Sequence, residues 1–228
     1  MKSDTLGRIL ESVEAKRPVV LATDLQSGEQ RLLHPGGGEG GDERANVELA
    51  LRLDKPITTD AEAGPRVFYQ PFNPPLRLVL VGAVHIAQPL SVIATLAGYE
   101  VIIVDPRSAF AASERFPGVK LDLAWPDEAL ESLGLDQRCA IVTLTHDPKL
   151  DDAALGVALR SDAFFIGCLG STKTHAARRR RLAKAGFSES NLDRLQGPVG
   201  LPIGSRSPAE IAVSVLAQVI QTLRKPSP

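Results

Sequence analysis

The chain has 228 residues, of which 43% are hydrophobic and 23% are charged, and its formal net charge is −1. These values are ordinary for a soluble globular protein, and they lack the basic excess typical of proteins that bind nucleic acids or membrane surfaces. No apolar run approaches the roughly 18 residues of a membrane span, and the N-terminal sequence MKSDTLGRILESVEAKRP has no apolar signal-peptide core. The two cysteines are too few for a disulfide scaffold and fit reduced thiols. We therefore expect a cytoplasmic protein without a nucleic-acid partner or a membrane span.

The N-terminal third is expected to form a small α+β unit. In chain order, its pattern predicts a helix over 3–15, a hairpin of strands over 19–24 and 31–33, a helix that Asp42 caps and that runs to Leu53, and a strand over 67–70. The glycine-rich loop 35–41 fits either an anion cradle or a flexible linker or plain loop. The proline cluster 71–75 cannot continue a helix or a central strand. We therefore expect a domain boundary there, with domains over 1–73 and 74–228.

The second part of the chain alternates strands and helices. The expected strands lie at 77–81, 101–105, 140–144 and 163–166, and the expected helices at 84–97, 151–159, 172–185 and 207–223. Ser207, Pro208 and Glu210 form a capping box with proline at the first helical position of the last helix. This alternation predicts an α/β fold with a Rossmann-like, mainly parallel sheet and helices on both faces.

A glycine turn follows the first strand of this part. Gly82 ends the strand, and Asp105 closes the next one at about the 20-residue spacing at which a Rossmann unit places its ribose-binding acid. Val84, however, occupies the position at which a second glycine lets the backbone approach a pyrophosphate. The sequence thus predicts a βαβ unit without a working dinucleotide site.

Ligands of open α/β sheets bind beyond the carboxyl ends of the strands, where the strand order reverses. Four strand ends are therefore expected to meet at one crevice. Their polar and small residues are the candidate cofactor-binding residues: Gly82, Ala83, His85, Asp105, Arg107, Thr145, His146, Asp147, Gly167, Cys168, Gly170 and Ser171. No zinc spacing, P-loop or nucleophile elbow occurs in the sequence, so no catalytic or metal-ligating residue is assigned.

Several candidates also have a purely structural interpretation. His85 stands in a first helical turn, where it either meets an anion or faces solvent. Asp147 precedes Pro148 and starts a turn as readily as it forms an acid–base pair with His146. Cys168 is reactive if its thiol meets a helix N-terminus, and otherwise it is a buried, inert thiol.

The arginines differ in what their positions indicate. Arg107 follows a strand-end Asp-Pro, where a guanidinium can fork onto a phosphate or a carboxylate. The run Arg178 to Arg181 points all around its helix because successive residues turn through about 100°. We therefore expect that run to form a solvent-exposed helix face rather than a phosphate-binding site.

The strand-end motifs follow one another in a fixed order along residues 76–223. They are Val81-Gly82-Ala83-Val84-His85-Ile86-Ala87, Val104-Asp105-Pro106-Arg107, Glu114-Arg115-Phe116-Pro117, Thr145-His146-Asp147 with Asp151, Phe165-Ile166-Gly167-Cys168-Leu169-Gly170-Ser171, the basic helix, Gly197-Pro198-Val199-Gly200-Leu201 and Ile203-Gly204-Ser205-Arg206-Ser207-Pro208-Ala209-Glu210-Ile211-Ala212. In this order they resemble the XdhC/CoxI family, the accessory factors of xanthine dehydrogenase and related molybdenum hydroxylases.

The resemblance implies a non-catalytic chaperone that binds the molybdenum cofactor (molybdopterin) as transient cargo, protects it during maturation and inserts it into an apo molybdenum hydroxylase. It also implies a homodimer, with a cysteine desulfurase and a cofactor biosynthesis protein as further partners. The family's Gly-Gly-Cys-Leu-Glu-like segment lacks its cysteine here, where Gly36-Gly37-Gly38-Glu39 stands, so thiol chemistry falls to Cys168 or to none.

Two other functions stay open at this point. An NAD(P)-dependent oxidoreductase or nucleotide-binding protein is favoured by Gly82 and Asp105 and opposed by Val84. A cofactor-free protein-interaction module in molybdoenzyme assembly is the third candidate, and its ancestral pocket would have closed.

Overall fold

The computed structural model of this protein describes residues 3–59 and 66–224. Contacts divide the chain into two compact units, Met1–Pro74 and Pro75–Pro228, and the division falls within the proline cluster 71–75. In the described ranges, no helix is long and apolar enough to cross a membrane.

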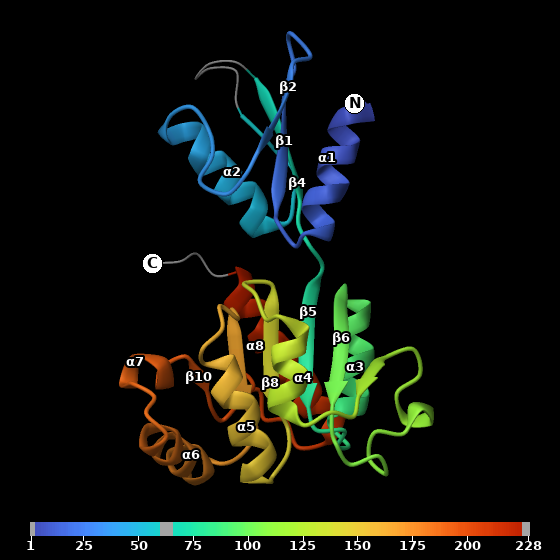
Figure 1. Ribbon diagram of the computed structural model, residues 1–228, viewed down its shortest axis with the longest axis vertical. Coiled ribbons are helices and arrows are strands. Elements are labelled where there is room, and N and C mark those ends of the chain that lie inside the picture. Colours follow the sequence, from blue (N-terminus) through green and yellow to red (C-terminus); the bar gives the residue numbers. More distant parts are fainter. Residues whose placement is uncertain (1–2, 60–65, 225–228) are drawn as a thin grey trace. The chain divides into compact units, whose positions relative to one another are not determined.

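The first unit contains a four-stranded antiparallel sheet in the order β2-β1-β4-β3. Its elements are α1 (Ser3–Glu14), β1 (Val19–Asp24), β2 (Gln30–Leu33), α2 (Gly41–Leu53), β3 (Ile57–Thr58) and β4 (Val67–Phe72). Figure 1 shows α1 and α2 on opposite sides of this sheet. Val20, Val47 and Tyr69 belong to the small core between the sheet and α2. The expected N-terminal α+β unit with its hairpin is thus confirmed.

The glycine-rich loop 35–41 is a folded turn held by carboxylates. The amide of Gly36 donates to Glu48 at 2.8 Å, and the amide of Glu39 donates to Glu43 at 2.5 Å. These carboxylates bind amides that an anion cradle would need to offer, and they fix a segment that a flexible linker would leave loose. The plain-loop interpretation is therefore the one that these contacts support.

The start of α2 differs from the sequence-based expectation. The helix begins at Gly41 with Gly40 as its N-cap, and no side chain caps it. Asp42 lies inside the first turn, where its negative charge favours the positive end of the helix. The prediction of Asp42 as the capping residue is wrong, because the preceding glycines let the helix start two residues earlier, with Gly40 as the N-cap.

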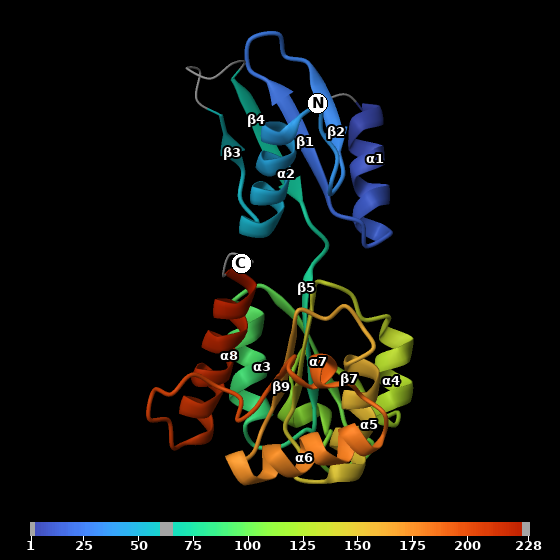
Figure 2. The ribbon, with the colours of Figure 1, turned by 90° about the vertical axis from the view of Figure 1, so that its left-hand side faces the viewer.

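The second unit contains a six-stranded parallel sheet in the order β10-β9-β8-β5-β6-β7. Its elements are β5 (Leu76–Val81), α3 (Ala87–Leu96), β6 (Tyr99–Val104), the 3₁₀ turn η2 (Ser113–Arg115), β7 (Lys120–Asp122), α4 (Pro126–Leu133), β8 (Cys139–Thr143), α5 (Pro148–Ala158), β9 (Phe165–Cys168), α6 (Thr172–Lys184), α7 (Glu189–Leu192), β10 (Leu195–Gln196) and α8 (Pro208–Arg224). Figure 2 shows α3 and α8 on one face of this sheet and α4 and α5 on the other. The predicted Rossmann-like sheet is confirmed.

The central strand β5 is buried along its whole length. Leu78 and Leu80 pack into the core beneath α3 and α8, whereas Val79 and Val81 pack into the core on the opposite face. Because helices cover both faces of the sheet, the residues of this strand are apolar from Leu78 to Val81. The strand order reverses between β5 and β8, so the edge where these strands end is the topological switch point.

Several boundaries move relative to the sequence-based prediction, and two of these shifts decide where candidate site residues lie. Strand β9 continues to Cys168, which pairs with Thr143 of β8, so it does not end at Ile166. Helix α3 begins at Ala87, so the residues from Val84 to Ile86 form a turn before the helix.

Candidate functional site

Asp105 lies at the centre of the carboxyl edge of the parallel sheet. Its carboxylate is fully buried and accepts four hydrogen bonds: from Nε and the amide of Arg107 to Oδ1, at 2.8 and 3.0 Å, and from Nη2 of Arg107 and the amide of Ala83 to Oδ2, both at 2.8 Å. Burial by itself would raise the pKa of Asp105, but these hydrogen bonds outweigh it and lower the pKa. Because both oxygens are occupied, Asp105 does not serve as the ribose-binding acid of a dinucleotide site.

Arg107 offers the remainder of its guanidinium to solvent. Its side chain is 37% exposed, and Nη1 has no hydrogen-bond partner in the described part of the chain. The guanidinium lies 4.4 Å from the centroid of the half-exposed Phe110 ring, which supports it by a cation–π contact. Hydrogen bonding to Asp105 raises the pKa of Arg107 further. The result is a permanent positive charge in a fixed position at the edge.

The Gly82 turn follows β5 and packs against Thr145, just beyond the end of β8. Gly82 has φ +112°, and a Cβ at this residue would lie 2.6 Å from Cγ2 of Thr145, so only glycine fits. Within the described residues, the amides of Val84, His85 and Ile86 donate to no acceptor, and no side chain caps α3. These open amides precede the positive end of α3, and they follow directly after Ala83, whose amide shares Oδ2 of Asp105 with the Arg107 guanidinium.

Arg115 fixes the loop that leaves β6, a role that sequence reasoning missed. Its Nη1 donates to the carbonyl oxygen of Ala83 at 2.9 Å, and its Nη2 donates to the side chain of Gln88 at 3.3 Å. Phe116, the next residue, is buried in the core beneath α3. The Glu114-Arg115-Phe116-Pro117 motif thus anchors the Arg107 loop to the Gly82 turn.

Thr145 and Asp151 form a buried contact beneath the edge. The Thr145 hydroxyl donates to Oδ1 of Asp151 at 2.6 Å, and Arg178 donates to Oδ2 at 3.1 Å. Burial raises the pKa of Asp151, although the hydrogen bond from Thr145 and the charge of Arg178 favour its ionised form. Asp147 and Asp151 both raise the pKa of Arg107, so both carboxylates lie within electrostatic reach of the exposed guanidinium.

Asp147 and Ser171 are helix caps. Oδ1 of Asp147 accepts the amide of Lys149 at 2.9 Å at the start of α5, and Oγ of Ser171 accepts the amide of Thr174 at 3.2 Å at the start of α6. His146 is exposed, and the described residues include no hydrogen bond between it and Asp147. The turn-starting interpretation of Asp147 is the one that the contacts support.

Gly170 also serves the turn that precedes α6. It has φ +137°, and a Cβ at this position would lie 3.1 Å from the Thr174 side chain. His85 is exposed before α3, at the same edge of the sheet. The exposed or partly exposed candidates are therefore His85, Arg107, His146, Asp147, Gly170 and Ser171.

Gly167 and Cys168 lie inside the sheet. A Cβ on Gly167 would lie 2.6 Å from the Val199 side chain, which covers β9 at this point. The Cys168 thiol is fully buried, and burial raises its pKa to about 11. The expectation that both residues face the crevice is not supported, because β9 extends two residues further than its apolar pattern suggested.

Three arginines of α6 pair with acids, but only Arg178 is buried, so the rest of the run keeps the expected exposed or partly exposed face. Arg178 is buried against Asp151, Arg179 pairs with Glu189 and Asp193, and Arg181 pairs with Asp152. Arg180 is exposed. The burial of Arg178 was not predicted because its partner Asp151 lies 27 residues away, on α5.

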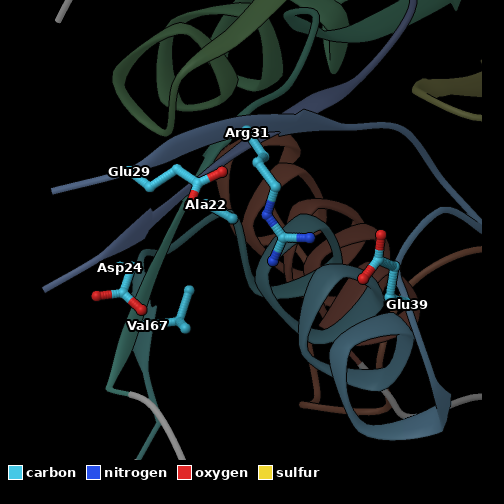
Figure 3. Close-up of a pocket in the computed structure, with 6 residues that line it drawn as sticks. All are labelled: Ala22, Asp24, Glu29, Arg31, Glu39 and Val67. Carbon is cyan, nitrogen blue, oxygen red and sulfur yellow. The ribbon is translucent and has the colours of Figure 1, made fainter. Parts of the chain in front are cut away.

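A separate cavity of about 330 Å³ lies in the first unit. Figure 3 shows its lining residues: Ala22, Asp24, Glu29, Arg31, Glu39 and Val67. Arg31 is engaged by Glu43 at 2.6 Å, so carboxylates dominate the remaining polar lining. This cavity therefore does not offer the positive charge that an anionic ligand needs.

Comparison with known proteins identifies the class to which this fold and edge belong. The model of the XdhC Rossmann domain matches residues 78–219, the part that contains the parallel sheet. The chain belongs to the XdhC family.

Individual relatives agree with this assignment. The chain is 35% identical over 160 residues to a probable xanthine dehydrogenase subunit of Bacillus subtilis, covering 70% of this chain and 46% of that protein. It is 28% identical over 148 residues to the molybdenum cofactor insertion chaperone PaoD of Escherichia coli, covering 65% of this chain and 40% of that protein. The chain thus spans less than half the length of these relatives.

A solved structure resembles nearly all of the chain. A Bacillus halodurans protein, whose crystal structure is described as that of a xanthine dehydrogenase, superimposes with a TM-score of 0.72 at 25% identity. The match covers 97% of this chain and 67% of the other. The similarity therefore extends over both units.

Proposed function

We propose that this protein binds the molybdenum cofactor as transient cargo at the carboxyl edge of its parallel sheet and assists its insertion into a xanthine dehydrogenase-type molybdenum hydroxylase. The observation that carries the proposal is the guanidinium of Arg107, which is fixed by Asp105, is partly exposed, and shares an Asp105 oxygen with the amide of Ala83, where the turn with the open amides of Val84, His85 and Ile86 begins. This edge lies within the segment that matches the XdhC family, and one relative is named as a cofactor insertion chaperone.

The chemistry of the cargo suits these groups. The molybdenum cofactor is a pterin with a phosphate and an anionic metal head, and such anions bind to arginine and to the amides of helix N-termini. Asp147 and Asp151 lie within electrostatic reach of Arg107 and reduce the net positive potential there. A partly exposed and partly neutralised site favours release, which a carrier needs.

The proposed contact residues are the accessible groups of the edge. Arg107 and the turn from Gly82 to Ile86 would receive an anionic group, while His85, His146 and Ser171 would line the approach. Gly167 and Cys168 are left out because they are buried. Cofactor protection, a homodimer, and contacts with a cysteine desulfurase and a cofactor biosynthesis protein belong to this proposal as expectations from the family.

Cofactor retention tests the proposal. The purified full chain is mixed with molybdopterin cofactor and passed through gel filtration, and the cofactor that elutes with the protein is measured. We expect retention by the wild type and clearly weaker retention by Arg107→Gln. Arg160→Gln is the matched control, because Arg160 is exposed just beyond the opposite end of α5. The proposal fails if the wild type retains no cofactor, with or without a molybdoenzyme.

A further inference from the structure

A buried chain of polar contacts runs beneath the carboxyl edge of the second unit. Nη2 of Arg178, on α6, donates to Oδ2 of Asp151 at 3.1 Å and to the carbonyl oxygen of Leu169 at 3.0 Å. Oδ1 of Asp151, on α5, accepts the Thr145 hydroxyl at 2.6 Å. Arg178, Asp151 and Thr145 are each only 2% exposed. These three residues are called the buried relay below.

The buried relay reaches the proposed site through a close contact at Gly82. Thr145 packs against Gly82 so tightly that a Cβ there would lie 2.6 Å from Cγ2 of Thr145. The next residue, Ala83, donates its amide to Asp105 at 2.8 Å, and Asp105 holds Arg107. One continuous set of contacts therefore joins α6 and α5 to the ends of β8, β5 and β6. Figures 1 and 2 show α6 at this same end of the unit.

The energetics of the Asp151–Arg178 pair indicate that it positions neighbouring residues more than it stabilises the fold. Nε and Nη1 of Arg178 have no hydrogen-bond partner within the described residues, so only one of its nitrogens is used. Desolvation of a buried ion pair commonly cancels its Coulombic attraction, and apolar replacements are often as stable. What the pair supplies is a directional contact that fixes Thr145.

We propose that Arg178 and Asp151 are positioning residues that act through Thr145, holding the Gly82 turn and the Asp105–Arg107 pair in the geometry that receives the anionic cargo. The identity of the cargo rests on the proposed function. The mechanical link rests only on the contacts of the buried relay, so the two are tested by different readouts.

The fold offers a matched control for the buried relay. Asp152 follows Asp151 on α5, and it also binds α6, accepting Nη2 of Arg181 at 2.9 Å. The side chains of this second pair are 26% and 38% exposed, and neither residue hydrogen-bonds to Thr145. Asp152→Asn therefore removes an α5–α6 ion pair without breaking the relay.

The experiment compares Asp151→Asn, Thr145→Val, Thr145→Ser and Asp152→Asn in the full chain. Two-dimensional ¹H–¹⁵N spectra report the amides of Gly82 and Ala83 and the Nε–H of Arg107, without any ligand. Cofactor retention per folded protein is measured alongside. Thr145→Val keeps the shape of the side chain and Thr145→Ser keeps the hydroxyl, so the pair separates packing from hydrogen bonding.

We expect Asp151→Asn and Thr145→Val to shift the resonances of Gly82, Ala83 and Arg107, and we expect Thr145→Val, which changes no charge, to weaken retention about two- to thirtyfold. Thr145→Ser should fall closer to the wild type than Thr145→Val, and Asp152→Asn should leave these signals in place. Identical spectra for Asp151→Asn and Asp152→Asn, or changes confined to the neighbours of residue 151, would overturn the positioning role. If the wild type retains no cofactor, the proposed function fails, and the spectra still decide whether the buried relay positions the edge.

Discussion

Asp105 holds Arg107 in a bidentate ion pair, with Nε–Oδ1 and Nη2–Oδ2 both at 2.8 Å, although only one residue separates them in sequence. The same carboxylate binds the amide of Ala83, so the acid at the end of β6 ties down the glycine turn at the end of β5. In a dinucleotide-binding protein an acid at this spacing faces the ribose. In this protein it faces inward and fixes an arginine that faces outward.

Replacing Asp105 by asparagine should destabilise the second unit. Asparagine has one acceptor oxygen, and its amide group would face the donors of Arg107, so several hydrogen bonds to a buried charge are lost. We expect the free energy of unfolding in urea to fall by about 2–4 kcal/mol. Asp152→Asn, which removes a partly exposed pair, should cost about 1 kcal/mol or less. Equal losses for the two variants would contradict the role given to Asp105.

The Asp105 contribution should depend on pH in a defined direction. Its folded-state pKa lies below the ordinary value of 3.8, so the unfolded chain takes up this proton first as the pH falls. The stabilisation is therefore complete above 3.8 and is lost as the pH falls through the folded-state pKa. Urea unfolding of the wild type and Asp105→Asn should show a constant difference at neutral and mildly acidic pH that shrinks only below this value. A difference that already shrinks near neutrality would refute the assignment.

Both cysteines should be unreactive in the folded protein. Cys139 and Cys168 are fully buried, and burial raises the pKa of each thiol to about 11, so almost no thiolate forms at neutral pH. A disulfide reagent such as DTNB should label neither thiol in the native chain and both after unfolding. Rapid labelling of Cys168 in the native chain would reopen its exclusion from the site.

Gly82→Ala should be costly for two separable reasons. Alanine at φ +112° is strained, and its Cβ would collide with Cγ2 of Thr145 at 2.6 Å. We expect a loss of about 2 kcal/mol or more in unfolding free energy. Gly98→Ala provides the control, because Gly98 has φ +87° with no atom within 4 Å of the added Cβ and so carries backbone strain alone.

A double variant separates the collision from the strain. Thr145→Ser removes Cγ2, so Gly82→Ala should cost less in the Thr145→Ser background than in the wild type. Strictly additive losses in this double-mutant cycle would argue against a close contact between the ends of β5 and β8.

Local patterns in the sequence were sufficient for the central elements of the fold. The apolar run of β5 with Gly82 at its end predicted the first βα unit, and the capping box of α8 forms as expected. The Ser207 amide donates to Glu210 at 2.8 Å, and the Glu210 amide donates to the Ser207 hydroxyl at 3.3 Å. Such features depend on residues a few positions apart, which is why they are visible in sequence.

Contacts between residues far apart in the sequence, and very short elements, could not be predicted from such local patterns. Strands β7 and β10 are three and two residues long, too short for a periodic pattern, and both were missed. Helix α4 was also missed, although Pro126 at its start is a recognisable signal. Burial of Arg178 depends on Asp151 in another helix, and no spacing rule links those two positions.

The most direct test of the central claim is thermal unfolding of the full chain with molybdopterin cofactor, with NAD and with NADP in parallel. A ligand at about 100 times its dissociation constant stabilises the native state by about 2.7 kcal/mol, which is a measurable rise in Tm. We expect the cofactor alone to raise Tm, and Arg107→Gln to reduce that rise. A rise with NAD or NADP and none with the cofactor would contradict a cargo site at this edge and favour a nucleotide-binding protein.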